Sequence, residues 1–246
     1  MSKFFVDKTS VGDGEILISN KDDIRHISKV LRLKAGDRVL VSDCDSFDYQ
    51  SEILDIQGDE KIVLRILDKQ RFSGEPDLLI TLFQGLPKQG KIETIIQKSV
   101  ELGVHKVVPI FTDRTVVTDK GNLQKKLERW QRISDEAVKQ CLRGIPPVIE
   151  YPMDFQRMLK EINTYDQTII PYENEDVVSI KEVLRGYLEK PKTMALIIGP
   201  EGGFSQKEVD MAVEAGCRPV TLGKNVLRTE TAGIAALSMI MYELEL

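Results

Sequence analysis

The order of predicted secondary structure changes abruptly near residue 72, and this change restricts the chain to few architectures. Before it, apolar runs at 4–6, 15–19, 38–42, 49–56 and 61–67 are separated by Gly-Asp turns and interrupted by a single predicted helix. After it, apolar runs of strand length alternate with segments of helical periodicity. The first pattern predicts a small β-barrel, and the second predicts a parallel sheet flanked by helices.

A short polar segment at 71–76, Arg-Phe-Ser-Gly-Glu-Pro, separates the two patterns. We therefore expect two domains, at residues 1–72 and 73–246. The expected strands of the second domain are 78–83, 104–111, 148–151, 168–171, 193–198 and 219–222. Its expected helices are 92–102, 123–140, 155–162, 180–187, 206–215 and 231–244.

Two basic stretches stand out against a net charge of −5. Residues 21–38 hold six basic and three acidic side chains, and residues 120–143 hold seven basic and three acidic ones. The first stretch contains the helix expected after a cap at Asn20 or Asp22. The spacing of Arg25, Lys29 and Arg32 predicts that they share one face of it. An acidic protein with such stretches can contact a phosphate backbone locally, although solvated helix faces are the simpler interpretation.

Residues 197–205, Ile-Ile-Gly-Pro-Glu-Gly-Gly-Phe-Ser, follow a predicted buried strand. Ser205 and Glu208 form a capping box, so the next helix begins there. Three glycines within five residues allow backbone groups to approach a ligand closely, whereas a tight turn seldom needs three. Because ligands of parallel sheets bind where strands end, this loop is a candidate binding site.

A second loop, residues 222–232, follows the last predicted strand and leads into the apolar final helix. A helix start explains Thr229 as the N-cap and Glu230 as a carboxylate near the helix dipole. It does not explain Arg228, because a cation near a helix N-terminus is mildly unfavourable. Arg228 is therefore the stronger candidate for a functional side chain.

Several common sites are absent from the sequence. It contains no dinucleotide fingerprint, no phosphate-binding P-loop and no nucleophile elbow. The three cysteines are widely scattered and only two histidines occur, so we expect no metal site. No apolar run approaches the ~18 residues of a membrane span, and an acidic residue comes too early for a signal peptide. We therefore expect a cytoplasmic protein that does not associate with membranes.

The two loops, I-G-P-E-G-G-F-S and L-G-K-N-V-L-R-T-E-T-A, resemble those of the SPOUT methyltransferases, and more closely those of the bacterial RsmE family. The similarity covers nearly the whole chain. It includes H-I-S-K-V-L-R at 26–32 and L-P-K at 86–88 with I-I-Q-K-S-V-E-L-G at 95–103. It also includes Arg114, Arg129-Trp130 and Gln140-Cys141-x-Arg143. Cys141 stands where the family often has serine, and we assign it no role.

The resemblance implies an α/β fold with a SPOUT-type parallel sheet and a C-terminal trefoil knot, preceded by a small PUA-like β-barrel domain that binds RNA. It implies S-adenosyl-L-methionine-dependent methylation of N3 of a specific uridine in bacterial 16S ribosomal RNA. The expected partners are ribosomal RNA or the small ribosomal subunit, and a second copy of the chain in a homodimer. Two alternatives stay open: a non-catalytic RNA-binding ribosome-assembly factor with a degenerate methyltransferase fold, and a small-molecule enzyme.

The resemblance also implies site residues. The cofactor would contact Ile198, Gly199, Pro200, Glu201, Gly202, Gly203, Leu222, Gly223, Val226, Leu227, Thr231 and Ala232, with 171–173 as a third wall. Arg228 would stabilise the uracil anion, and Glu230 would either accept the N3 proton or hold Arg228 in place. RNA contacts are expected from Arg25, Lys29, Arg32, Lys88 and Lys91. Because N3 lies on the Watson–Crick edge, the target base must be unpaired or extruded.

Overall fold

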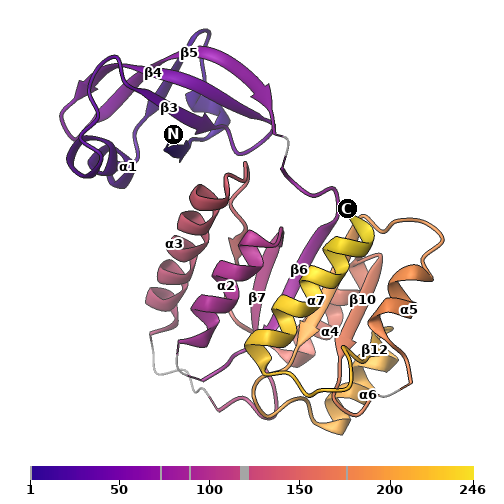
Figure 1. Cartoon of the computed structure of the whole chain (residues 1–246). Coiled ribbons are helices and arrows are strands. Elements are labelled where there is room, and N and C mark those ends of the chain that lie inside the picture. The colour runs from indigo at the N-terminus through magenta and orange to yellow at the C-terminus, as the bar shows by residue number, and fades with distance from the viewer. Residues whose placement is uncertain (1, 73, 89, 117–121, 176) are drawn as a thin grey trace. The chain divides into compact units, whose positions relative to one another are not determined.

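The computed structural model describes residues 2–72, 74–88, 90–116, 122–175 and 177–246. Ser73 of the expected linker and Lys120 of the second basic stretch lie outside the described residues. The chain divides into two compact units (Figure 1). The first comprises Met1–Glu75 together with Val138–Pro146, and the second comprises Pro76–Ala137 and Pro147–Leu246. A segment far along the chain thus belongs to the first unit, which no local sequence pattern indicated.

The first unit is built on a five-stranded sheet in the order β1-β3-β4-β5-β2. Its strands are β1 (Lys3–Phe5), β2 (Glu15–Ile18), β3 (Arg38–Ser42), β4 (Phe47–Gln57) and β5 (Lys61–Arg71), with a short 3-10 turn at Lys8–Ser10. β1 pairs parallel with β3, and the other pairs are antiparallel. Alternate residues of these strands face one core, which the helix covers with Ile24 and Ile27.

The helix of the first unit is shorter than expected. The Asn20 side chain accepts hydrogen bonds from the backbone N–H groups of Asp22 and Asp23, which starts α1 (Lys21–Arg25). A π-helical turn, His26–Val30, continues it. The chain then leaves the helix, and Arg32 has a left-handed φ of 55°. The expectation that Arg25, Lys29 and Arg32 share one helix face is therefore wrong for Arg32, although all three side chains are exposed.

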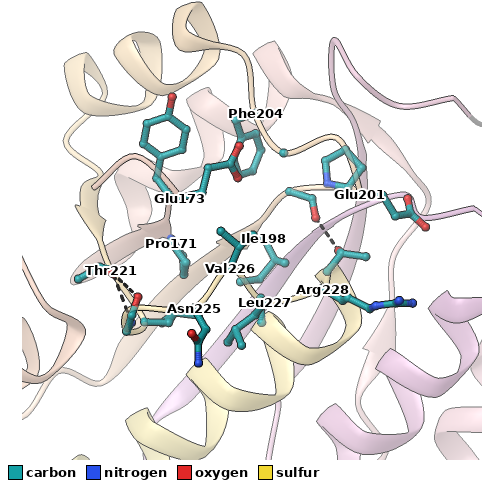
Figure 2. A pocket seen from close by; sticks show the side chains of 18 of the residues that line it. Pro171, Glu173, Ile198, Glu201, Phe204, Thr221, Asn225, Val226, Leu227 and Arg228 are labelled. Carbon is teal, nitrogen blue, oxygen red and sulfur yellow. Dashed lines mark hydrogen bonds between the residues drawn. The ribbon is translucent and has the colours of Figure 1, made fainter. Parts of the chain in front are cut away.

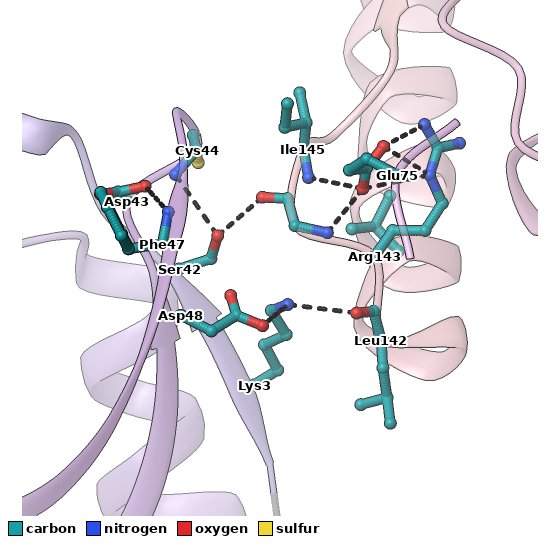
Figure 3. A network of polar contacts seen from close by, with 12 residues as sticks. Lys3, Ser42, Asp43, Cys44, Phe47, Asp48, Glu75, Leu142, Arg143 and Ile145 are labelled. Atoms are coloured by element: carbon teal, nitrogen blue, oxygen red, sulfur yellow. Dashed lines mark hydrogen bonds and ion pairs between the residues drawn. The ribbon is translucent and has the colours of Figure 1, made fainter. Parts of the chain in front are cut away.

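A network of polar contacts holds the segment Val138–Pro146 in the first unit (Figure 3). The Glu75 carboxylate accepts hydrogen bonds from Arg143 Nη2 at 2.9 Å, from Gly144 N at 2.6 Å and from Ile145 N at 3.1 Å. Ser42 Oγ donates to the Gly144 carbonyl at 2.7 Å. These partners lie about 70 to 100 residues apart in the chain.

The second unit contains a parallel sheet in the order β12-β10-β11-β6-β7-β8, with β9 paired to β7. The strands are β6 (Leu79–Gly85), β7 (Lys106–Phe111), β8 (Val148–Ile149), β9 (Met153–Asp154), β10 (Gln167–Pro171), β11 (Thr193–Ile198) and β12 (Arg218–Val220). β11 lies between β10 and β6 and is buried on both faces, which explains its continuous apolar sequence. Of the expected strand at 148–151 only 148–149 forms β8, and β9 lies beyond its expected end. β12 ends two residues before the expected strand end.

Helices cover both faces of this sheet (Figure 1). They are α2 (Lys91–Glu101), α3 (Leu123–Cys141), α4 (Phe155–Glu161), α5 (Ile180–Arg185), α6 (Gln206–Glu214) and α7 (Thr229–Leu244), with a 3-10 turn at Ile162–Thr164. Ile197 packs in a cluster with residues of α4 and α6, whereas the next residue, Ile198, lies close to Gly233 of α7. α7 packs against α2 and α5. Because all strands are parallel, the loops that follow β10, β11 and β12 meet at one edge.

Among the described residues, none of the helices combines the length and the apolar character needed to cross a lipid bilayer.

Candidate active site

A pocket of about 420 Å³ lies at the edge where β10, β11 and β12 end (Figure 2). Its walls are the loops after these three strands and the start of α7, with Lys91 of α2 at one side. This volume falls within the range of small-molecule sites. The cavity therefore lies at the carboxyl ends of parallel strands, the position where α/β proteins commonly bind ligands.

Most residues expected to contact a cofactor line this one pocket: Ile198, Gly199, Pro200, Glu201, Gly203, Leu222, Gly223, Val226, Leu227 and Ala232. The third wall, 171–173, lines it too. Gly202 and Thr231 are not among the lining residues. The Gly202 carbonyl instead accepts a hydrogen bond from Arg114 Nη1 at 2.7 Å, and Thr231 is exposed on α7. Further lining residues that the sequence did not assign to the pocket are Phe204, Thr221, Lys224, Asn225, Thr229 and Lys91.

Glycines allow the backbone to pass closely around the pocket. A Cβ on Gly85, at the end of β6, would lie 2.5 Å from the backbone nitrogen of Pro200. Gly203 has a φ of +66°, and a Cβ there would lie 2.8 Å from both carboxylate oxygens of Glu173. Gly223 differs, because a Cβ would meet nothing within 4 Å. Its φ of +139° makes glycine favourable there, so backbone strain rather than a steric clash would penalise a side chain.

The loop after β11 is held by the loop after β7. The capping box at the start of α6 is confirmed, with Ser205 Oγ accepting from Glu208 N and the Glu208 side chain accepting from Ser205 N. The buried Glu208 carboxylate also accepts from Asp113 N at 2.8 Å, and Ser205 Oγ lies 2.8 Å from Asp113 Oδ2. These contacts and the Arg114–Gly202 bond fix the glycine-rich loop on the sheet edge.

Thr229 joins three elements at the base of the pocket. The sequence predicted that Thr229 caps α7, but Arg228 occupies the N-cap position and its side chain makes no capping hydrogen bond. The Thr229 hydroxyl instead donates to the Gly199 carbonyl at 2.6 Å and accepts from Gln84 Nε2 at 2.9 Å. Gln84 is fully buried on β6. The start of α7, the end of β11 and β6 are therefore connected by two consecutive hydrogen bonds, of which the one to Gln84 is buried and the one to Gly199 is partly buried.

The two candidate catalytic residues have different surroundings. Arg228 lines the pocket with an exposed side chain and, among the described residues, has no carboxylate within ion-pair distance. Glu230 Oε2 lies 3.3 Å from Lys91 Nζ. The structure therefore pairs Glu230 with Lys91, and it does not show Glu230 holding Arg228.

Lys91 also pairs with Glu201, whose Oε1 lies 3.1 Å from Lys91 Nζ. The pKa of Lys91 is raised, first by its contact with Glu201 and then by Glu230. Burial acts to raise the pKa of Glu201, but hydrogen bonds from backbone N–H groups, including that of Lys88, and the Lys91 ammonium lower it overall. The carboxylate and the ammonium are thus both held in their charged forms.

The residues expected to bind RNA fall into two groups. Arg25, Lys29 and Arg32 are exposed on the first unit, where Lys29 Nζ lies 3.3 Å from Asp59. Lys88 is exposed in the second unit, before α2. Lys91 differs from the other four because its side chain lines the pocket.

Two sequence families match the chain: residues 74–241 match an RNA methyltransferase domain, and residues 18–67 match an RNA methyltransferase PUA domain. The ribosomal RNA small subunit methyltransferase E of Bacillus subtilis is 31% identical over 252 aligned positions, covering 100% of this chain and 98% of that protein. The chain belongs to the RsmE family. A second relative, from Buchnera aphidicola (Schizaphis graminum), is 35% identical over 91% of this chain and 89% of its own length.

Solved structures agree with this membership. The RsmE of Neisseria gonorrhoeae bound to S-adenosyl methionine superposes with a TM-score of 0.86 at 27% identity, covering 98% of this chain and 97% of that one. A putative methyltransferase of Legionella pneumophila in complex with the same cofactor superposes with a TM-score of 0.85 at 30% identity, covering 98% of this chain and 96% of that one. The expected α/β fold with a parallel sheet and a preceding PUA-like domain is confirmed, and the chain is a member of an RNA methyltransferase family.

Proposed function

We propose that this RsmE-family protein transfers a methyl group from S-adenosyl-L-methionine to N3 of a specific uridine in bacterial 16S ribosomal RNA. One observation carries the proposal: the loops from three strand ends, the one after β11 rich in glycine, surround one pocket. Arg228, which has no carboxylate within ion-pair distance among the described residues, lines that pocket. The names of the relatives support ribosomal RNA of the small subunit as the target, and two structural neighbours were solved with S-adenosylmethionine.

The pocket residues fit such a cofactor. Apolar surface comes from Ile198, Leu222, Leu227 and Val226, the last of which is 81% exposed and so available for a ligand to cover. Backbone groups of the loops after β11 and β12 offer donors and acceptors to an adenine edge. When bound there, S-adenosyl-L-methionine supplies an electrophilic methyl group.

The chemistry gives Arg228 a specific task. Neutral uridine is a poor nucleophile because N3 carries a proton, so the site must favour the imide anion. A guanidinium aimed at a uracil carbonyl stabilises that anion as it forms. Glu230 is proposed to take part through its charge, either accepting the N3 proton or holding the neighbouring cation Lys91.

RNA is proposed to contact the first unit through Arg25, Lys29 and Arg32, and the second through Lys88. Exposed cations of this kind bind phosphates and release counterions. The PUA family match at 18–67 includes the first three residues and supports this assignment. We also propose, from the family resemblance, that the chain following β11 forms the trefoil knot and that the protein works in the cytoplasm.

A homodimer is part of the proposal. The outward face of α7 is uncharged over three turns, and its Tyr242 is 71% exposed while Met239 is 36% exposed. Thr231, Ala235 and Ser238 continue this face at helical spacing. An exposed helix face without charges suits burial against a second copy, since charged groups are depleted at the centres of interfaces.

The test combines binding and product analysis. Isothermal titration calorimetry of the purified chain should show one S-adenosylmethionine site per chain. Mass spectrometry of small-subunit RNA treated with enzyme and cofactor should then show N3-methyluridine. A folded protein that binds RNA but no cofactor would instead support the assembly-factor alternative. Methylation of a different nucleoside atom would refute the N3 assignment alone.

A further inference from the structure

Lys91 occupies a position that an ordinary surface lysine does not. It is the first residue of α2, and its ammonium lies between the carboxylates of Glu201, after β11, and Glu230, in the first turn of α7. α2 and α7 pack together, and both begin at the edge where the pocket lies. The Lys91 side chain is 32% exposed and lines the pocket.

The two carboxylates leave part of the ammonium available. A lysine ammonium has three N–H donors. Two can be directed at Glu201 and Glu230, and within the described part of the chain the buried Glu230 Oε2 makes no aligned hydrogen bond. At least one donor therefore stays available to a molecule in the pocket. The carboxylates also order a flexible side chain in advance, which is how supporting groups prepare a functional residue.

The uracil imide presents two acceptors, because its N3 lies between the O2 and O4 carbonyls. When N3 loses its proton, the negative charge spreads over both oxygens. A single guanidinium can stabilise one of them, which leaves the other without a cation from Arg228.

We propose that Lys91 is a second catalytic cation, donating a hydrogen bond to one uracil carbonyl while Arg228 donates to the other. This rests on the proposed function. In the balanced step, the N3 proton passes to a base, either the Glu230 carboxylate or a base of the solvent, and N3 forms a bond to the methyl carbon. The sulfur–methyl bond breaks, and sulfur keeps the electron pair. The two cations hold the anion from both sides of N3 while that bond forms.

The same geometry argues against a phosphate contact, the role that the sequence suggested for Lys91. A phosphate at this ammonium would approach two carboxylates that already lie 3.1 and 3.3 Å from Nζ, and like charges repel at such distances. A carbonyl oxygen carries no full charge until the reaction begins. The anion that later forms spreads its charge over two oxygens and N3, so less negative charge faces the carboxylates than with a phosphate.

The test measures anion stabilisation directly. RNA with 5-fluorouridine at the target position is bound to the enzyme together with S-adenosylhomocysteine, and ionisation of N3 is followed by 19F NMR from neutral to alkaline pH. Among the described residues, Lys91 forms ion pairs with Glu201 and Glu230. The other charged residues that line the pocket are Glu173, Lys224 and Arg228. We expect the wild-type complex to lower the N3 pKa relative to free RNA. Lys91→Met should raise it by about one unit relative to wild type, a tenfold loss of anion stabilisation.

Matched variants separate this role from a structural one. Lys98→Met removes another α2 lysine that pairs with Glu101 outside the pocket, and it should leave the N3 pKa unchanged. Lys91→Arg should restore part of the effect, because it keeps the charge in a different geometry. Single-turnover methylation by Lys91→Met should fall about 10- to 100-fold, while calorimetric affinity for S-adenosylmethionine stays within about twofold.

Two results would overturn the proposal while leaving the proposed function intact. In the first, the wild-type enzyme methylates N3, but the N3 pKa in the Lys91→Met complex equals that in the wild-type complex. The other is a loss of RNA affinity with an unchanged N3 pKa, which would make Lys91 a phosphate contact. A wild-type enzyme that does not methylate N3 would refute the proposed function itself, and that control requires no variant.

Discussion

Replacing Thr229 with valine should destabilise the second unit and disturb the pocket together. Valine matches the shape of threonine but lacks the hydroxyl that donates to the Gly199 carbonyl at 2.6 Å and accepts from Gln84 Nε2 at 2.9 Å. Thr229 is 5% exposed and Gln84 is fully buried, so water cannot replace the lost partner readily. Of its hydrogen bonds to described residues, Gln84 Nε2 would keep the one to the Gly85 carbonyl at 3.0 Å.

The size of the effect follows from these contacts. A buried group left without its partner costs about 1–3 kcal/mol, and here one carbonyl loses its hydroxyl donor while one amide loses an acceptor. We expect a total loss of about 2–4 kcal/mol in the free energy of unfolding. For a domain of 150–250 residues, each kcal/mol lowers Tm by about 2–4 °C, so the expected decrease is roughly 5–15 °C.

The assay is thermal and urea unfolding of wild type, Thr229→Val and Thr229→Ser, followed by calorimetry with S-adenosylmethionine. Serine retains the hydroxyl and should lose no more than about 1 kcal/mol, mainly from the missing methyl group. Because Gly199 lines the pocket, Thr229→Val should also weaken cofactor binding. A free energy of unfolding for Thr229→Val that lies within about 0.5 kcal/mol of the wild-type value would refute the importance of these hydrogen bonds.

Three further predictions concern charge. Arg228→Ala should reduce single-turnover methylation by ~10²–10³ with little change in cofactor affinity, and near-normal turnover would remove Arg228 from the mechanism. Reversing Arg25 and Arg32 to glutamate should weaken RNA binding and flatten its dependence on salt, with cofactor affinity unchanged; filter binding across salt concentrations checks this. The pKa of Glu201 is lowered in the folded state, so its stabilisation is present above the ordinary value of 4.5 and is lost as pH falls below it. The advantage of wild type over Glu201→Gln in the free energy of unfolding should therefore shrink in acid, by about 1 kcal/mol or less. Urea unfolding at several pH values checks this, and a pH-independent difference would contradict the role given to the Glu201 carboxylate.

The parts of the site that sequence patterns predicted are those with local causes. Three glycines close to the capping residue Ser205 predict a loop whose backbone can approach a ligand closely, and this loop lines the pocket. Alternating strands and helices likewise imply that strand ends share one edge. Such patterns depend on neighbouring residues and on backbone periodicity, which are visible in one sequence.

The parts that were missed depend on partners far along the chain. Thr229 has the residue type and the sequence position of an N-cap, but its hydroxyl accepts a hydrogen bond from Gln84, which is 145 residues away. Segment Val138–Pro146 continues a helix of regular periodicity, and its place in the first unit depends on Glu75, about 70 residues earlier. No local rule specifies such long-range pairs.

Lys91 shows the same limit for charge. Its sequence context resembles that of the neighbouring lysines and indicates only a basic residue near the start of a helix. Its two carboxylate partners come from different loops and helices, and only the fold brings them to 3.1 and 3.3 Å. A residue's role in a site is therefore harder to predict than the presence of the site.

Methylation of N3 by this chain is measured most directly by nucleoside mass spectrometry of small-subunit ribosomal RNA from a strain that lacks its gene. The strain is complemented in parallel with the wild-type chain, with Arg228→Ala, or with an empty vector. We expect N3-methyluridine to be absent without the gene, restored by the wild-type chain and not restored by Arg228→Ala. N3-methyluridine at its normal level in the strain without the gene would contradict the account.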